Sequence, residues 1–543
     1  MKNFRKLINS ELEQLAGKEN VYQEILVDTM SHPLNDDLFV VVAQQAKNNR
    51  VCRTCLQRKF NILFNSTSDI VPEIDLDTAE STVIDCASSG FGMAITNAEI
   101  AQSWSMLAPW PDCQKCTYEL SELIPERPYF SYTGEKLKKL NAGNGIQRKI
   151  SSENFNSAHR GYFGFASVLL NPSIDSTGGI YTVDTGMFLD KITDFAPVGG
   201  KGTSLEQALA SCIGEGIERY YICSRPMGET QVFAARHFRN EKWYGALDFD
   251  KKSIAISDDS QIEVRSLEVL GGRDMIYAPD SLIFAPYTPP NNDIISPTPS
   301  STTGAAAGGT IEEATLQAIF ELIERDAFWF ATRTNMSLIP IGQPFHSSIA
   351  DSIRHQYDVD IVLRWVPNPL QIPIAHCTIF SNIPGVNMCS RGMGVTPNPQ
   401  ESINKSIIEA IQMWRSIATG VEVTSSETDM RSLWWSGKAK EIFPGLFGDS
   451  EYTEIDNVNF WEPSSAETPD SILQELVEHA SRNGIYFARS ILNDSGWHSV
   501  VRCISNRILP LDDVYFPKLR RFDDWSKFTS TKGFVKYTGP LFM

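Results

Sequence analysis

The feature that most constrains this chain of 543 residues is a pattern that occurs twice. The pattern is E-x-x-E-R, found in GEGIERY, which starts at Gly214, and in FELIERD, which starts at Phe320. Each copy falls late in a predicted helix, and the two helices span Ser204–Cys223 and Thr310–Thr332. A Ser or Thr followed three residues later by Gln or Glu is a capping-box signature, and it predicts both helix starts. The chain therefore contains two helices of the same kind, each preceded by a glycine-rich segment.

The four glutamates of these patterns are the main candidates for a metal site. Glu215 and Glu218 are three residues apart, as are Glu321 and Glu324, so each pair shares one face of its helix. Two like charges at this spacing repel, and the arginine that follows each pair offsets only part of the repulsion. A solvated helix face is the simpler interpretation of one such pair. The repetition favours a site in which carboxylates from two facing helices hold Mg²⁺.

The glycine-rich segments are expected to be loops that approach phosphate groups. They are GGKG at 199–202 and GAAAGG at 304–309, and each leads into the start of a predicted helix. Lys201 lies among these glycines, but a Walker A loop requires Ser or Thr after the lysine, and Gly202 stands there. No G-x-G-x-x-G pattern lies between a strand and a helix. A nucleotide must therefore be bound by another type of fold.

Alternating strand and helix patterns predict the fold class. We expect an α/β (α+β) architecture, in which a region of mixed sheets and helices spans 151–543 and a smaller region spans 1–150. A polar, glycine- and asparagine-rich stretch at 136–152 marks the boundary. Further elements are expected as helices at Glu11–Asp28, Pro399–Thr419 and Pro469–Asn483, and as strands at 38–43, in both halves of 167–188, at 359–366 and at 372–380.

Two C-x-x-C pairs lie in the first region. Cys52 and Cys55 form one pair and Cys113 and Cys116 the other, and two such pairs match the tetrahedral tetrathiolate geometry of structural Zn²⁺. Redox-active pairs and four unrelated cysteines are the alternatives, but a redox role does not explain two pairs. The intervening segment must fold to bring them together. We therefore predict a small zinc-binding region.

Composition and the first residues exclude several classes of protein. The chain has 48 Lys and Arg against 66 Asp and Glu, a net charge of −18, which argues against nucleic acid as a general partner. No apolar run is long enough to span a membrane, and the first residues have no apolar signal-peptide core. No G-x-S-x-G or H-E-x-x-H pattern is present. A cytoplasmic enzyme is the expectation.

The sequence resembles the YcaO superfamily. The resemblance is carried by GKGTSLEQALASCIGEGIERY and TGAAAGGTIEEATLQAIFELIERDAF, and it extends more loosely over 155–543. It implies ATP and Mg²⁺ as cofactors, with the four glutamates as ligands of Mg²⁺ bound to ATP phosphates. The residues that match the ATP site of the family are Lys201, Ser211, Glu313, Arg325 and Arg502. Glu313 has a second interpretation, because as a capping-box residue it would reach back to the backbone N–H of Thr310.

The resemblance also implies a reaction. In azoline-forming members, a Cys, Ser or Thr side chain of a ribosomally made precursor peptide attacks the preceding amide, whose oxygen ATP phosphorylates. Loss of phosphate leaves a thiazoline or oxazoline, as in thiazole/oxazole-modified microcins and other bacteriocins. No catalytic side chain of the protein is required. Related members install thioamides or close amidine rings, and the sequence here ends YTGPLFM without the Pro-x-Pro-x-Pro tail common in the azoline branch.

The segment VCRTCLQRKF, with the distant second C-x-x-C pair, resembles the zinc-binding part of the ubiquitin-activating-enzyme-like partner of these cyclodehydratases. It therefore favours the azoline branch. The resemblance implies a separate leader-binding protein, an azoline oxidase, and assembly as a homodimer or within a multi-enzyme complex. The alternative from another class is a non-catalytic leader-binding or assembly subunit, which four intact glutamates argue against.

Overall fold

The computed structural model describes three strands near the N-terminus and most of residues 173–508. The described residues are 25–32, 35–45, 93–96, 173–187, 196–223, 231–238, 257–297, 300–333, 336, 338–342, 347–386, 388–418, 434, 436–447, 459–464, 468–494 and 498–508. Strands β1 (Ile25–His32), β2 (Asn35–Gln45) and β3 (Met93–Thr96) form an antiparallel sheet in the order β1-β2-β3. The expected strand at 38–43 is confirmed within β2. The helix expected at Glu11–Asp28 is wrong at its end, because Ile25–Asp28 pair with Val42–Gln45 in this sheet.

The first sheet of the main region carries one of the two E-x-x-E-R helices. Strands β4 (Ser173–Thr177), β5 (Ile180–Met187) and β6 (Ala196–Gly202) pair antiparallel in that order. Helix α6 (Leu205–Cys223) follows β6 directly and packs back onto β5 and β6. Its apolar face, which includes Ile213 and Ile217, is buried against Val183 and Val198. The expected strand–turn–strand and the first expected helix are therefore confirmed.

The second sheet carries the other E-x-x-E-R helix. Its path is β10-β16-β15-β8-β7, with β9 also paired to β8, and every pairing is antiparallel. The strands are β7 (Gln231–Ala234), β8 (Gln261–Val269), β9 (Met275–Pro279), β10 (Ala305–Gly308), β15 (Phe487–Asp494) and β16 (Ser499–Ser505). Helix α7 (Ile311–Arg333) follows β10 and packs on β16, and helix α13 (Pro469–Arg482) packs on α7.

The third sheet has a strand–helix unit of the same design. Strands β11 (Ile339–Pro340), β12 (Val359–Trp365), β13 (Ile374–Ser381) and β14 (Cys389–Val395) pair antiparallel in chain order. Helix α9 (Pro399–Ala418) follows β14 and covers β13 and β14, and helix α8 (Ser348–Gln356) packs against β12. Short helices α11 (Ala439–Ile442) and α12 (Pro444–Phe447) come before α13, with α12 against α7.

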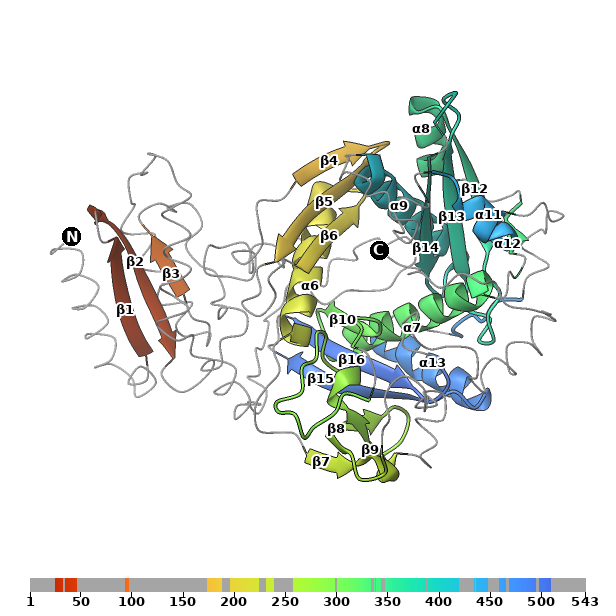
Figure 1. Ribbon diagram of the computed structural model, residues 1–543. Helices are drawn as coiled ribbons and strands as arrows, with labels where there is room; N and C mark the ends of the chain where they lie inside the picture. Colours follow the sequence, from red (N-terminus) through yellow and green to blue (C-terminus); the bar gives the residue numbers. More distant parts are fainter. Residues whose placement is uncertain are drawn as a thin grey trace.

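Helix α7 is the central element of this arrangement. Figure 1 shows it between the sheet of β11–β14 above and the sheet that contains β10, β15 and β16 below, with α6 to its left and α9 above it beside β14. The largest apolar core surrounds it, and Leu322 and Phe328 of α7 pack there with residues of β14 and α13. The mixed α/β fold class predicted from the sequence is confirmed. Within the part of the chain that the structure describes, none of the helices has the length and apolar character needed to cross a membrane.

Candidate functional site

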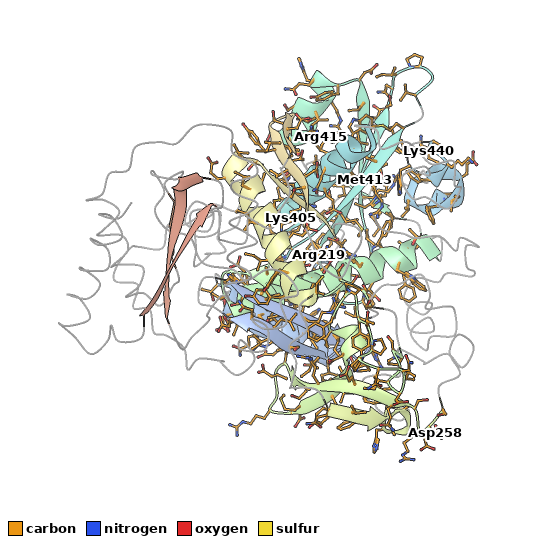
Figure 2. The ribbon with its side chains drawn as sticks, turned by 60° about the vertical axis from the view of Figure 1, so that its left-hand side comes forward. Arg219, Asp258, Lys405, Met413, Arg415 and Lys440 are labelled. Atoms are coloured by element: carbon orange, nitrogen blue, oxygen red, sulfur yellow. The ribbon has the colours of Figure 1, made fainter. Side chains whose placement is uncertain are left out.

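The first half of the candidate site lies where α6 packs against β6. The backbone N–H of Gly199, on β6, donates to Glu215 Oε2 at 3.0 Å. The other oxygen of Glu215 lies 3.0 Å from the guanidinium of Arg219, one helical turn later, which is labelled in Figure 2. Arg219 also reaches Glu218 at 3.4 Å. Glu215 is therefore fixed on both of its oxygens, by the strand and by its own helix.

The second half repeats this geometry on α7. The backbone N–H of Gly304 donates to Glu321 Oε2 at 2.8 Å, and Glu321 Oε1 lies 2.8 Å from Arg325. Arg325 also donates to the Thr303 hydroxyl at 3.2 Å. The two E-x-x-E-R helices thus have the same contacts at corresponding positions, and the predicted equivalence of the two segments is confirmed.

The glycine-rich segments differ from the prediction in their conformation. Residues 199–202 lie in β6, and 305–308 form β10, so neither segment is a loop. Three of their N–H groups, those of Gly199, Gly304 and Gly309, donate to carboxylates of the protein. The glycines are needed because each strand lies directly against the helix that follows it. A Cβ on Gly308 would lie 2.6 Å from the backbone nitrogen of Ala314, and one on Gly200 would overlap Ala208 and Cys212.

The second glutamate of each pattern lies in a more buried and more acidic environment. Burial raises the pKa of Glu218 to about 8, with Glu321 and Glu215 adding to the rise and Arg219 opposing it. Burial also raises the pKa of Glu324 to about 8, where Glu409 and Glu321 contribute and Arg325 and Lys201 oppose. Glu218 and Glu321 come from different helices, so the structure brings α6 and α7 together as predicted. Such carboxylates are stabilised in their charged form by a nearby cation.

Helix α9 adds a carboxylate that the sequence analysis missed. Glu409 lies 2.8 Å from the Lys201 ammonium and raises the pKa of Glu324, so it belongs to the same cluster. Burial alone would raise the pKa of Glu409, but Lys201 and Arg391 hold it below its usual range. Glu409 is the eleventh residue of α9, as Glu215 is of α6 and Glu321 of α7. That shared position, after a glycine-containing strand, is the signal that could have revealed it.

Arg502 lies beneath the junction of α6 and α7. It stands on β16 with no exposed surface, and its Nε donates to the Leu282 carbonyl at 2.8 Å. Burial lowers the pKa of Arg502 to about 10, while the charges of Glu321 and Glu218 act to raise it. Among the described residues, its two terminal nitrogens have no hydrogen-bond partner. A buried guanidinium with unsatisfied donors suits an oxygen-rich anion such as a phosphate.

Two other predicted ATP-site residues, Glu313 and Ser211, lie earlier on their helices than the glutamates of the E-x-x-E-R patterns. Glu313 accepts the Gly309 N–H at 3.1 Å and is nearly buried, so its carboxylate contacts the backbone at the start of α7, one residue before the expected Thr310. Gln207, near the start of α6, accepts the Thr203 N–H in the same way, at 3.0 Å. Ser211 is exposed one turn before Glu215. Roles of Glu313 and Ser211 toward ATP remain predictions.

The described residues do not contain a preassembled metal site. No three of their His, Cys, Asp or Glu side chains are grouped so that they could hold a metal ion together. The donors nevertheless suit Mg²⁺ with a nucleotide, because Mg²⁺ takes one or two carboxylates and completes its shell with phosphate and water oxygens. Cys212 lies in the buried face of α6, as expected for a packing residue, and burial raises the pKa of its thiol to about 12. The four cysteines of the predicted zinc region lie outside the described residues.

The arrangement of three strand–helix units around a cluster of glutamates and cations is that of an established family. Residues 199–505 match the YcaO family, described as YcaO cyclodehydratases that bind ATP and Mg²⁺. The chain belongs to this family. An uncharacterized protein of Methanothermobacter thermautotrophicus is 35% identical over 131 residues, which are 24% of this chain and 32% of that protein. The chain thus spans about a third of the length of the curated relative it matches.

Solved structures support the same fold. A heterocyclase in complex with substrate and cofactor aligns with a TM-score of 0.65 and 14% identity, covering 90% of this chain and 74% of that one. The YcaO protein from Methanopyrus kandleri, bound with AMPPCP and Mg²⁺, aligns with a TM-score of 0.55 and 18% identity, covering 69% of this chain and 97% of that one. At these identities the likeness concerns the fold.

Proposed function

We propose that this protein is an ATP-dependent peptide cyclodehydratase, which converts Cys, Ser or Thr residues of a ribosomally made precursor peptide into thiazolines or oxazolines. The observation that carries the proposal is the position of Arg502. Its two unsatisfied terminal nitrogens lie, fully buried, under the junction that brings Glu218 and Glu321 together. Phosphate oxygens bound with Mg²⁺ would satisfy the arginine and the carboxylates at the same time.

The chemistry needs positioning and charge neutralisation more than a nucleophile from the protein. The substrate side chain forms a bond to the carbon of the preceding amide, and the amide oxygen takes the γ-phosphoryl group of ATP with release of ADP. Elimination of phosphate then forms the C=N bond of the ring, and the amide and side-chain protons are lost. The net change in the peptide is the loss of one water per ring. Described residues of the cluster offer cations and carboxylates suited to such a phosphoryl transfer.

The roles proposed for individual residues come from the family pattern, and the contacts of several of them support it. We assign Mg²⁺ binding to Glu215, Glu218, Glu321 and Glu324, and contacts with ATP to Lys201, Ser211, Glu313, Arg325 and Arg502. Mg²⁺ supplies charge neutralisation on the phosphates when it is bound. Arg219 and Arg325 hold the first glutamate of each pattern in place, and the N–H groups of Gly199 and Gly304 fix its second oxygen.

The decisive experiment measures the mass of a peptide after reaction. The protein is incubated with ATP, Mg²⁺ and a Cys-, Ser- and Thr-containing peptide encoded beside its own gene. The expected product has lost one water for each modified residue, and ADP and phosphate appear in equal amounts. An unmodified peptide with no ATP consumed would overturn the proposal in favour of a non-catalytic subunit. An exchange of oxygen for sulfur, or ring closure by an amine, would place the protein in another branch of the family.

We also propose the remaining organisation of the protein. Residues 151–543 form the catalytic region, and residues 1–150 form a zinc-binding region through Cys52, Cys55, Cys113 and Cys116. The precursor peptide is the substrate, and a separate leader-binding protein and an azoline oxidase are its working partners. The likeness in fold to a heterocyclase in complex with substrate supports the proposal of a peptide substrate.

A further inference from the structure

Two strands of the site each contact two of its helices and carry a buried arginine. Strand β16 contacts α6 and α7 and carries Arg502, whose charge interacts with Glu218 and Glu321. Strand β14 contacts α7 and α9 and carries Arg391, whose charge interacts with Glu409 and Glu324. The two arginines come from different sheets. Each of them therefore lies near one carboxylate from each of two helices.

Two aromatic rings fix the position of Arg391. The side chain is 5% exposed, and the central carbon of its guanidinium lies 4.3 Å from the ring centre of Phe328 and 5.6 Å from that of Trp434. Phe328 is one turn after Glu324 on α7, so the guanidinium lies close to that part of the helix. Aromatic faces attract a guanidinium and orient its plane, while its N–H donors, which lie in that plane, suit the oxygens of carboxylates or phosphates.

The cluster contains both kinds of group that a metal–nucleotide complex requires. Its carboxylates and cations include Glu215, Glu218, Glu321, Glu324 and Glu409, and Lys201, Arg219, Arg325, Arg391 and Arg502. Carboxylates suit a metal ion, and arginine and lysine suit phosphate oxygens. A metal–nucleotide complex would take both, with the carboxylates toward the metal and the arginines toward the phosphates.

We propose that Arg391 binds a phosphate of the nucleotide, as the counterpart, on β14, of Arg502 on β16. The proposal rests on the proposed function, because it needs a nucleotide in this cluster. It adds a residue of the third sheet to the site. It also gives a reason for the presence of a buried cation on β14, where burial by itself is unfavourable.

The test measures ATP binding by calorimetry in the presence of Mg²⁺ and without peptide. The variants are Arg391→Met, Arg391→Gln and Arg391→Lys. The control is Arg364→Met, because Arg364 is a buried arginine of the same sheet whose amino groups bond the Leu446 and Phe447 carbonyls at 3.1 and 3.4 Å. Circular dichroism and melting midpoints establish that each variant is folded.

We expect the Kd for ATP to rise about tenfold or more for Arg391→Met and Arg391→Gln, and less for Arg391→Lys, because a lysine keeps the charge. The control should bind within about twofold of the wild type. If Arg391 served only in packing, the order of the Kd values would be reversed, since Met suits a buried position better than Lys and would preserve ATP binding better. Equal or tighter binding by the folded Met variant, compared with Lys, would therefore overturn the proposal. If Met prevents folding, the comparison of Gln with Lys decides in the same way.

The outcome for the wild type separates the two proposals. A wild-type protein that binds no ATP with Mg²⁺ contradicts the proposed function. A wild-type protein that binds ATP, together with a folded Arg391→Met variant that binds it equally well, contradicts only the assignment of Arg391.

Discussion

The ammonium nitrogen of Lys201 lies 2.8 Å from a carboxylate oxygen of Glu409, across 208 residues of sequence. The pair joins β6, in the first sheet of the main region, to α9, which covers the third sheet. Both side chains are about one-third exposed, at 32% and 34%. A pair with this exposure contributes little to stability, typically less than about 1 kcal/mol. Its value to the protein therefore lies in placing the lysine beside Glu324 and Glu409.

Replacing this lysine should affect nucleotide binding more than stability. In Lys201→Met, the Kd for ATP with Mg²⁺ is expected to rise about tenfold, because the charge that we propose to contact a phosphate is lost. The melting midpoint should fall by only a few degrees. Calorimetry and a thermal melt measure the two effects. Arg236→Met, which removes an exposed pair with Asp259 at 2.6 Å, is the control and should leave ATP binding unchanged.

Replacing Glu321 should abolish activity and preserve the fold. In Glu321→Gln, the amide oxygen still accepts the Gly304 N–H, but the negative charge that pairs with Arg325 and that we assign to Mg²⁺ binding is lost. ATP consumption in the presence of peptide should fall by about a hundredfold or more, as expected when charge stabilisation of a phosphoryl transfer is removed. Glu312→Gln, in the first turn of the same helix, should retain activity. Full turnover by Glu321→Gln would contradict the magnesium assignment.

The pKa values of Glu218 and Glu324 predict how stability depends on pH. Burial and neighbouring carboxylates raise both pKa values to about 8, above the usual value of 4.5. Between these values the folded protein holds protons that the unfolded chain releases, so the free energy of unfolding falls as pH rises from about 5 to 8. In the absence of ATP and Mg²⁺, Glu324→Gln should remove part of this dependence and be more stable than the wild type at pH 8, by about 1–3 kcal/mol.

Denaturant titrations at pH 5.5 and pH 8 measure this effect. The control is Glu206→Gln, an exposed glutamate in the first turn of α6. The free energy of unfolding of this control should have the same pH dependence as that of the wild type. If the stability of Glu324→Gln has the same pH dependence as the wild type, the pKa of Glu324 in the folded protein is not raised.

Two glycines should respond in opposite directions to the same substitution. Gly200→Ala places a Cβ against the backbone of α6 and should destabilise the protein by about 1–3 kcal/mol. Gly214→Ala lies within α6 with open space at the Cβ position, and should stabilise it by about 0.5–1 kcal/mol through helix propensity. The free energies of unfolding in denaturant provide the comparison. A stabilising Gly200→Ala would contradict the close packing of β6 on α6.

The predicted zinc region can be tested by measuring the zinc content of the protein. Elemental analysis of the purified protein should give about one zinc per chain, because four thiolates complete one tetrahedral site. The double variant Cys52→Ser/Cys113→Ser should lose the metal. A double variant of the separate cysteines Cys377 and Cys389, which are buried in the third sheet, should keep it. Zinc-free wild-type protein would contradict the prediction.

The sequence by itself determined the repeated local units of this protein. Helix starts, the spacing of Glu215 and Glu218, and the matching pattern at Glu321 and Glu324 depend on residues within one helix turn, and such short-range rules can be read from the chain. The helices expected at Ser204–Cys223, Thr310–Thr332, Pro399–Thr419 and Pro469–Asn483 agree with the structure to within about one residue at each end.

Only the tertiary structure decided which units meet. The glycine-rich segments were expected to be loops, because glycine is usually read as a breaker, but they are strands packed so closely on helices that a Cβ does not fit. The contact of Glu409 on α9 with Lys201 on β6, and that of Arg391 on β14 with Phe328 on α7, each join separate strand–helix units. No local pattern encodes them, since they depend on how three sheets are placed around α7. The repeated motif indicated a site for Mg²⁺ and ATP. The packing of the sheets added to it the residues of a third strand–helix unit, Arg391 on β14 and Glu409 on α9.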